Sequence, residues 1–411
     1  LAGYCALWPA AVSAAVSWVA RRRGVVLALT ATPFLWAAAE WGRGHLMSGF
    51  PWGLIGYSQY AHLRVIQIAE LGGVYAVSFV IVTVNATLAA AVTLPRRRAL
   101  GAAAIGAVIV VGTMVFGTWR LATIEAGPTV AVAIMQPSIE QPLKYDPRFT
   151  STTLGVYFAL TRSLLPGGAQ LVVWPETSAP TVLRQDPALQ RALESLSAAV
   201  GAPLLVGSVD VDTGLRNTAF LLDERGLRGR YDKMQLVPFG EYVPLARLIG
   251  FVRTWAEFIS EMEPGSRAVV FPGPPVPFGV VICYEGIFPD LVRSFVRGGA
   301  RLVINMTNDG WFGRTSGPQQ HLTMYSFRAV EHRVSIVRSA NTGVSAFIAP
   351  TGRIVRRLGL FERGIMTDRV SVRSVDTLYT RLGDWVVYVG FVVSGLVLIM
   401  AGRERETVNV R

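Results

Sequence analysis

The chain has 411 residues, of which 51% are hydrophobic and 16% are charged, and its formal net charge is +12. Soluble domains carry about 25% charged residues, so part of this chain is expected to lie outside water. The sequence contains no basic helix with interleaved aromatic residues, which argues against nucleic-acid binding. Its two cysteines, Cys5 and Cys283, lie far apart and outside any Cys/His pattern. Neither a metal site, a cofactor nor a disulfide is therefore predicted.

Five apolar runs are long enough to cross a bilayer, which takes roughly 20 residues. They cover residues 4–20, 24–41, 65–94, 99–119 and 384–402. These runs predict a bundle of transmembrane helices over residues 1–122 and a C-terminal transmembrane helix over residues 384–402. Residues 42–64 are too polar and glycine-rich for a span and are interpreted as an external loop. The sequence starts at Leu1 in an apolar segment without an initiator methionine, so we expect residues to be missing before it.

Arginine clusters predict the orientation of these spans. Residues 21–23 and 96–98, together with Arg403 and Arg405, all fall on one side if the five runs cross the membrane in turn. Arginine-rich segments beside spans face the cytoplasm. The sequence therefore predicts a multi-pass protein of the cell membrane whose middle domain faces the periplasm or the cell exterior.

The middle domain, residues 123–376, alternates short β-rich runs with helical ones, which predicts a layered α/β or αββα fold. Helices are expected near residues 150–164, 187–200, 287–298 and 318–332. Strands are expected at residues 130–135, 170–174, 203–208, 218–222, 276–283, 302–305, 336–340 and 345–349. Residues 223–226 and 350–353 are interpreted as hairpin turns.

Three contexts in this domain place reactive side chains just after strands. The first is Trp-Pro-Glu at residues 174–176, which presents Glu176. The second, residues 231–242, presents Lys233 and Glu241, and the third is Cys-Tyr-Glu at residues 283–285. Each context alone is weak, because such residues usually serve packing, turns or surface ion pairs. Together they supply a carboxylate base, a cation for an oxyanion and a thiol nucleophile, which is what acyl transfer needs.

The ordered set Trp-Pro-Glu, Asp-Lys and Cys-Tyr-Glu closely resembles the nitrilase superfamily. The apolar flanks extend the resemblance to its membrane-embedded branch, the bacterial apolipoprotein N-acyltransferases. Segments similar to that branch are residues 49–52, 56–59, 136–139, 144–147, 237–244 and 305–313. The resemblance implies an αββα nitrilase-like domain attached to an α-helical transmembrane bundle in the bacterial inner membrane.

The resemblance also implies a ping-pong reaction in which Cys283 accepts a fatty acyl chain from a membrane phospholipid as a thioester. Glu176 would be the base, and Lys233 would bind the oxyanion. The acceptor would be the α-amine of the diacylglyceryl-cysteine of an apolipoprotein. Supporting roles are expected for Glu241, Tyr284 and Glu285, and substrate contacts are expected for Tyr145, Phe251, Asn308 and Trp311. Tyr145 stands where the family is expected to have tryptophan.

Other interpretations remain open at this point. A membrane-tethered amidase that hydrolyses a small amide would use the same three residues, with water attacking the thioester. A catalytically idle scaffold would need no intact Glu–Lys–Cys set, and the apolar spans do not suit a small soluble substrate. Residues 245–262 mix large apolar residues with charges, which fits either an amphipathic lid at the membrane interface or a core helix.

Overall fold

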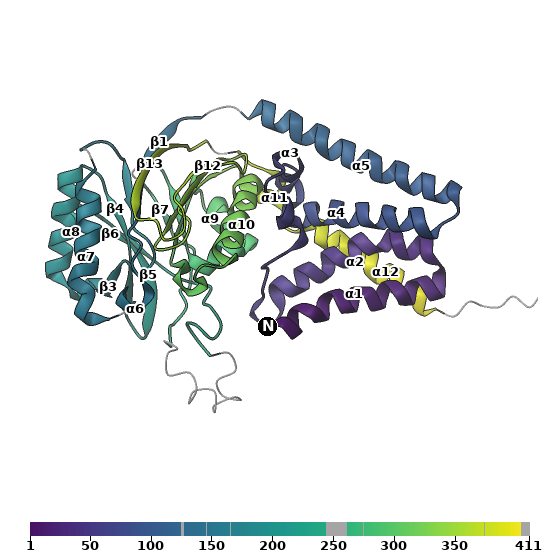
Figure 1. The fold of residues 1–411 in the computed structure, drawn as a ribbon, viewed down its shortest axis with the longest axis horizontal. Coiled ribbons are helices and arrows are strands. Elements are labelled where there is room, and N and C mark those ends of the chain that lie inside the picture. Colours follow the sequence, from purple (N-terminus) through teal and green to yellow (C-terminus); the bar gives the residue numbers. More distant parts are fainter. Residues whose placement is uncertain are drawn as a thin grey trace, which may run out of the picture. The chain divides into compact units, whose positions relative to one another are not determined.

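The structure is a computed structural model. It describes residues 1–124, 127–144, 146–164, 166–243, 261–273, 275–373 and 375–403. The chain divides into two compact units, one of Leu1–Ile124 with Thr377–Arg411 and the other of Glu125–Asp376. Figure 1 shows the first unit as a helical bundle and the second as a layered α/β domain. The two units are described separately.

In the described part of the helical unit, five helices are long and apolar enough to cross a membrane. They are α1 (Ala2–Arg23), α2 (Val25–His45), α4 (Ala69–Thr93), α5 (Arg96–Thr123) and α12 (Trp385–Gly402). Shorter helices are η1 (Leu46–Ser48), η2 (Ile55–Gln59), α3 (Leu63–Ile66) and α11 (Leu378–Leu382). The predicted run 65–94 is interrupted by a kink, because Gly72 and Gly73 leave helical geometry and Gly73 has a φ of 68°. A side chain at Gly73 would meet the ring of Tyr379 at 2.6 Å, so glycine is required at this crossing.

The helices pack through small and branched apolar residues and leave large ones on the outside. The buried cluster joins α1, α2 and α12 through Val12, Val19, Ala28, Ala31, Leu35, Val397 and Ala401. On α5 the side chains of Leu100, Ile105, Val108, Val111 and Val115 are exposed. An apolar outer surface over a small-residue interior is expected of helices surrounded by lipid.

The second unit has two sheets facing each other. The first runs in the order β13-β1-β2-β4-β5-β6, with β3 paired to β4, and the second in the order β12-β11-β10-β9-β8-β7. The first sheet contains β1 (Thr129–Gln136), β2 (Leu171–Val173), β3 (Ala179–Val182), β4 (Leu204–Val211), β5 (Leu215–Asp223), β6 (Gly226–Asp232) and β13 (Gly364–Ser371). The second contains β7 (Val270–Phe271), β8 (Phe278–Ile282), β9 (Leu302–Thr307), β10 (Ser335–Ala340), β11 (Ala346–Ile348) and β12 (Ile354–Arg357).

Helices cover the outer faces of both sheets, which gives the αββα layers expected from the sequence (Figure 1). The first sheet is covered by α7 (Thr150–Arg162) and α8 (Pro187–Val200), and the second by α9 (Pro289–Arg297) and α10 (Gly317–His332). Alternation along β1 shows how the layers form: Val132 and Ile134 enter the core between the sheets, whereas Ala133 and Met135 enter the core beneath α7 and α8. Successive side chains of a strand point to opposite faces of the sheet, so a strand buried on both faces is apolar at nearly every position.

Every predicted strand and helix of this unit is present in the structure, but five strands were not predicted. These are β3, β6, β7, β12 and β13. Three of them, β6, β12 and β13, lie at sheet edges and carry charged residues, so they lack the continuous apolar run that identified the central strands. The predicted turn at residues 223–226 connects β5 to β6, and the turn at residues 350–353 connects β11 to β12.

Candidate active site

The three side chains expected to react follow three different strands. Glu176 comes shortly after β2, Lys233 directly after β6 and Cys283 directly after β8. Lys233 Nζ lies 3.4 Å from Glu176 Oε1, and both side chains are buried. Cys283 lies in the field of both, because the charges of Glu176 and Lys233 both act on the pKa of its thiol. The two sheets therefore bring the three residues together in one candidate site.

The Glu176 carboxylate is surrounded by hydrogen-bond donors. Asn217 Nδ2 donates to Oε1 at 2.8 Å, and the backbone N–H of Asn308 donates to Oε2 at 2.9 Å. The carbonyl of Glu176 accepts a hydrogen bond from Lys144 Nζ at 2.7 Å. These contacts engage both carboxylate oxygens and the carbonyl of Glu176, so they hold the side chain in one orientation.

Lys233 makes its shorter ion pair with Glu241, whose Oε1 lies 2.8 Å from Nζ. The other oxygen of Glu241 accepts from the backbone N–H of Val237 at 2.8 Å, and Asn217 Nδ2 donates to Oε1 at 3.2 Å. Burial alone lowers the pKa of Lys233, but the carboxylates of Glu241 and Glu176 outweigh it and raise the pKa well above its usual value. Lys233 is thus a fixed cation.

Cys283 begins a short 3₁₀ turn, η6 (Cys283–Ile287), and has a φ of 53°. This left-handed geometry is costly for a residue with a side chain. The carbonyl of Cys283 accepts from Tyr325 Oη at 3.1 Å. Burial, reinforced by the Glu176 carboxylate, raises the pKa of the Cys283 thiol to about 12, although Lys233 lowers it. Cys283 therefore rests as a thiol, and it would need a base to act as a nucleophile.

Glu285 is buried and links the Cys283 turn to the loop after β6. Its Oε1 accepts from Tyr231 Oη at 2.7 Å and from the backbone N–H groups of Met234 and Gln235 at 2.6 and 3.1 Å. Its Oε2 accepts from the backbone N–H of Ile282 at 2.7 Å. Burial raises the pKa of Glu285 to about 7, although these donors favour the ionised form. Glu285 therefore fixes the segments on both sides of the reaction centre.

The remaining residues singled out in the sequence are placed differently. The Tyr284 ring packs edge to face on Phe288 at 5.1 Å between centroids. The side chain of Asn308 donates to Gln141 Oε1 at 2.9 Å, so it supports the loop in addition to its backbone contact with Glu176. Trp311 is 72% exposed. Tyr145, Phe251 and almost all of the predicted 245–262 segment lie outside the described residues.

Comparisons with known proteins show the family of this chain. The carbon-nitrogen hydrolase model matches residues 131–379, and the apolipoprotein N-acyltransferase N-terminal domain model matches residues 1–87. An apolipoprotein N-acyltransferase of Geobacter metallireducens is 38% identical over 416 residues, which cover 98% of this chain and 78% of that protein. One of Bradyrhizobium diazoefficiens is 35% identical over 92% of this chain and 73% of that protein.

The chain belongs to the apolipoprotein N-acyltransferase family. Among solved structures it is similar to Nit3 of Saccharomyces cerevisiae, a member of branch 10 of the nitrilase superfamily. That match is 19% identical, covers 63% of this chain and 96% of Nit3, and has a TM-score of 0.46. It is also similar to an amidase from Nesterenkonia sp., at 20% identity over 66% of this chain and 98% of the amidase, with a TM-score of 0.48.

A buried polar cluster that the sequence did not suggest supports the loop after β9. Arg338 donates to Asp309 Oδ2 and to Asn305 Oδ1, each at 2.5 Å, and His321 Nδ1 lies 3.0 Å from Asp309 Oδ1. Burial alone raises the pKa of Asp309, but Arg338 and His321 outweigh it and hold the pKa well below its usual range. The contacts of Arg338 and His321 with Asp309 thereby hold the loop whose Asn308 backbone N–H contacts Glu176.

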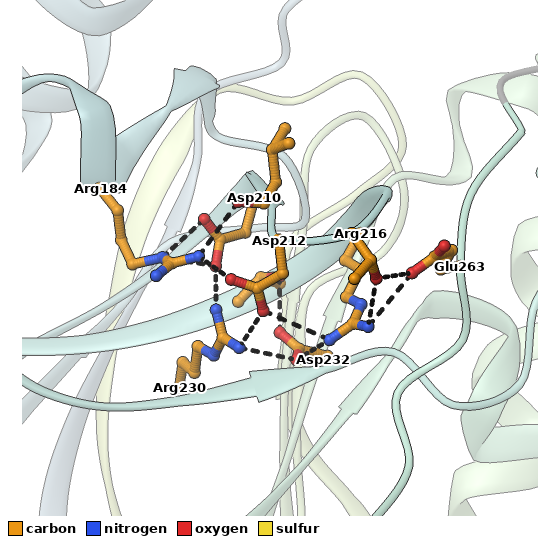
Figure 2. A network of polar contacts seen from close by, with 10 residues as sticks. Arg184, Asp210, Asp212, Arg216, Arg230, Asp232 and Glu263 are labelled. Atoms are coloured by element: carbon orange, nitrogen blue, oxygen red, sulfur yellow. Dashed lines mark hydrogen bonds and ion pairs between the residues drawn. The ribbon is translucent and has the colours of Figure 1, made fainter.

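A second network, nearer the surface, lies beside Lys233, where β4 and β6 end and β5 begins. Figure 2 shows its members joined by hydrogen bonds and ion pairs: Arg184, Asp210, Asp212, Arg216, Arg230, Asp232 and Glu263. Arg216, which precedes Asn217, lies 3.5 Å from Asp232 and 3.2 Å from Glu263. Asp232 in turn precedes Lys233, so the network fixes the strand ends that present the donors to Glu176. The ion pair between Arg216 and Asp232 thus holds together the residues that precede Asn217 and Lys233.

Asn217 and Lys144 contact Glu176 but were not identified as site residues from the sequence. Asn217 lies inside a strand that is otherwise mostly apolar. A polar residue in an apolar strand needs a hydrogen-bond partner, and this requirement is the sequence signal that indicates Asn217 as a site residue. Lys144 ends a single helical turn and begins segment 144–147, which resembles the family, but nothing in the sequence indicates that its side chain contacts Glu176.

Proposed function

We propose that this chain transfers a fatty acyl chain from a membrane phospholipid to the α-amine of the diacylglyceryl-cysteine of an apolipoprotein. Family membership supports the class of acceptor and the membrane setting. The observation that carries the chemistry is the buried Glu176–Lys233 pair, 3.4 Å between Oε1 and Nζ, beside the Cys283 thiol. Donor and acceptor are both anchored in the bilayer, which suits an enzyme with five apolar helices in its described residues.

In the first half-reaction Glu176 takes the proton of Cys283, and the thiolate attacks the carbonyl carbon of a phospholipid ester. Lys233 and the backbone N–H that follows Cys283 stabilise the oxyanion of the tetrahedral intermediate. When the intermediate collapses, the ester oxygen takes the proton from Glu176 and leaves as lysophospholipid. The product is a thioester between the acyl chain and Cys283 Sγ.

In the second half-reaction the α-amine of the acceptor attacks the thioester carbonyl. The amine is protonated when it arrives and must lose a proton before it can attack, and Glu176, ionised again after the first half-reaction, is the base. The sulfur of Cys283 then leaves and takes the proton that the attacking nitrogen loses as the amide forms, while the first proton, held by Glu176, passes to solvent. The acceptor departs with an amide. Hydrolysis would follow the same course with water in place of the amine.

The helical unit supports an orientation with its arginine-rich ends in the cytoplasm. Residues 21–23 lie at the junction of α1 and α2, and residues 96–98 begin α5. Arg23 donates to the carbonyls of Met400 and Arg403 at 2.7 and 2.8 Å, so the end of α12 lies at the same end of the bundle. With this end in the cytoplasm, residues 125–376 face the periplasm.

Mass spectrometry tests the proposal. Purified protein incubated with phospholipid is expected to gain one fatty-acyl mass that hydroxylamine removes. Cys283→Ala abolishes the adduct, and the matched control Cys5→Ala keeps it. Adding a diacylglyceryl-cysteine peptide discharges the adduct and gives an N-acylated peptide. Free fatty acid released at the same rate with and without the peptide, with no N-acylated peptide, would establish an amidase-like hydrolase instead.

A further inference from the structure

The chain contains 39 lysines and arginines, and only Lys144 and Lys233 are lysines. Arginine therefore serves wherever a surface or interfacial cation is needed in this chain. Both lysines are buried, with 1% of their surface exposed, and both contact Glu176. Lysine differs from arginine in being a compact charge whose pKa shifts readily when buried. Two lysines retained at one reaction centre point to a chemical requirement that arginine does not meet.

Lys144 holds the backbone of the catalytic glutamate. It ends α6 (Gln141–Lys144), and its Nζ donates to the carbonyl of Glu176 at 2.7 Å. The next residue, Thr177, has a φ of 46°, which is unusual for a β-branched residue. The Glu176 carbonyl belongs to the peptide that leads into this strained residue. The ammonium of Lys144 therefore stabilises the turn that aims the Glu176 carboxylate.

The helix α6 reaches Glu176 by a second route. Gln141, at its start, accepts from Asn308 Nδ2 at 2.9 Å, and the backbone N–H of Asn308 donates to Glu176 Oε2 at 2.9 Å. One helical turn thus contacts the carbonyl of Glu176 directly and its carboxylate through Asn308.

Lys144 also completes the charge of the reaction centre. Lys233 is shared between two carboxylates, Glu176 and Glu241, so one negative charge needs a second cation. The titratable groups that act on the pKa of Lys144 are Glu176 and Cys283. Burial lowers the pKa of Lys144 to about 8, while Glu176 and Cys283 act in the opposite direction.

We propose that Lys144 is a positioning residue of the acylation step: its ammonium fixes the Glu176–Thr177 turn and supplies the second positive charge beside Glu176 and Cys283. This inference rests on the proposed function for its role in acyl transfer. Lys144 itself gives up no proton and forms no bond in the reaction. Acylation of Cys283 therefore needs Lys144 in its charged form and slows when Lys144 loses its proton.

The first test is the pH dependence of Cys283 acylation in the whole chain. Wild-type acylation is expected to fall as the pH rises through about 8, and Lys144→Arg is expected to lack this fall because arginine stays charged. Lys144→Met is expected to be at least about tenfold slower at neutral pH, because loss of a positive charge beside Glu176 and Cys283 disfavours the thiolate. The matched control Arg148→Met removes a cation that is 83% exposed and keeps the wild-type profile.

Nuclear magnetic resonance supplies a readout that does not depend on acyl transfer. Protein with ¹³C-labelled lysine Cε has two lysine signals, and loss of one in Lys144→Arg assigns Lys144. That signal is expected to titrate near pH 8, whereas the signal of Lys233 does not. Iodoacetamide alkylation of Cys283, which needs no phospholipid, is expected to slow about tenfold in Lys144→Met.

The outcomes separate the two proposals. Failure of phospholipid to acylate the wild type, with Lys144 titrating near pH 8 and controlling alkylation, would refute the acyl donor and support the role of Lys144. Wild-type acylation and alkylation rates in Lys144→Met would overturn that role. A fall near pH 8 that persists in Lys144→Arg would do the same. A purely structural role would lower the melting temperature and slow both variants equally at every pH, which also contradicts the inference.

Discussion

Glu285→Gln is the substitution for which the structure gives the sharpest expectation. The two carboxylate oxygens of Glu285 accept four hydrogen bonds, from Tyr231, Met234, Gln235 and Ile282. Glutamine has the same shape but replaces one oxygen with an NH₂ donor. The milder orientation keeps the carbonyl oxygen toward Tyr231 and the loop, so the NH₂ faces the backbone N–H of Ile282. That N–H belongs to the residue before Cys283 and is left without an acceptor.

The magnitude follows from these four contacts. A buried donor that loses its acceptor costs about 1–3 kcal/mol, and the remaining bonds weaken because their acceptor is no longer charged. The combined effect on the placement of Cys283 is about 2–4 kcal/mol. If this energy adds in full to the activation barrier of acylation, the acylation rate falls roughly 30-fold to 1,000-fold. Tyr231→Phe removes a single donor without creating an unpaired one and is expected to cost about tenfold.

The assay is the initial rate at which Cys283 gains a thioester from phospholipid, with the melting temperature measured in parallel. Glu224→Gln, which changes an exposed carboxylate in the turn between β5 and β6, is the matched control and keeps the wild-type rate. A Glu285→Gln rate within about threefold of the wild type, in a protein of unchanged melting temperature, would refute the idea that Glu285 places the Cys283 turn.

Three further expectations follow from the same contacts. Because burial raises the pKa of Glu285 to about 7, acylation by the wild type is expected to rise with pH as this carboxyl ionises, and Glu285→Gln should lose that acid limb in a pH–rate profile. Lys233→Met removes the cation that Glu176 and Glu241 share and, in the proposed mechanism, a ligand of the oxyanion, so the rate constant of Cys283 acylation in single-turnover assays is expected to fall at least about 1,000-fold. Single cysteines placed at Glu224 and Arg403 of a cysteine-free variant should react with an impermeant maleimide in intact cells only at residue 224, and labelling only at residue 403 would invert the proposed orientation.

Local sequence was sufficient to find the residues that directly follow central strands. Glu176 and Cys283 come after runs of buried residues, and a reactive side chain at the end of such a run is visible without any knowledge of the fold. Lys233 follows the edge strand β6, whose residues are mostly exposed or half-buried, so only its Asp-Lys motif indicated it. Local sequence also predicted the layered architecture, because apolar residues recur with different periods in strands and in amphipathic helices.

The rest depends on pairings between distant parts of the chain. Strand β13 pairs with β1 across more than 200 residues, from Thr129 with Ser371 to Gln136 with Gly364, and its polar sequence shows no sign of this partner. Asn217 reaches Glu176 because β5 pairs antiparallel with β4, placing Asn217 opposite Val209. Register of this kind is set by tertiary packing. The contacts of Lys144 and Asn217 with Glu176 could not be read from their neighbours in sequence.

Backbone strain explains why so many donors surround the reaction centre. Thr177 and Cys283, with φ values of 46° and 53°, are left-handed residues that carry side chains, and such geometry costs about 1–3 kcal/mol each. In each case a carbonyl at the strained position is held by a side chain: Glu176 by Lys144, and Cys283 by Tyr325. A sharp turn at the nucleophile lifts the side chain away from the strand and turns the following N–H toward the oxyanion. The hydrogen bonds to the carbonyls of Glu176 and Cys283 thus offset strain beside the two residues to which the proposed mechanism assigns the proton transfer and the thioester, and their removal is expected to lower the rate of that reaction.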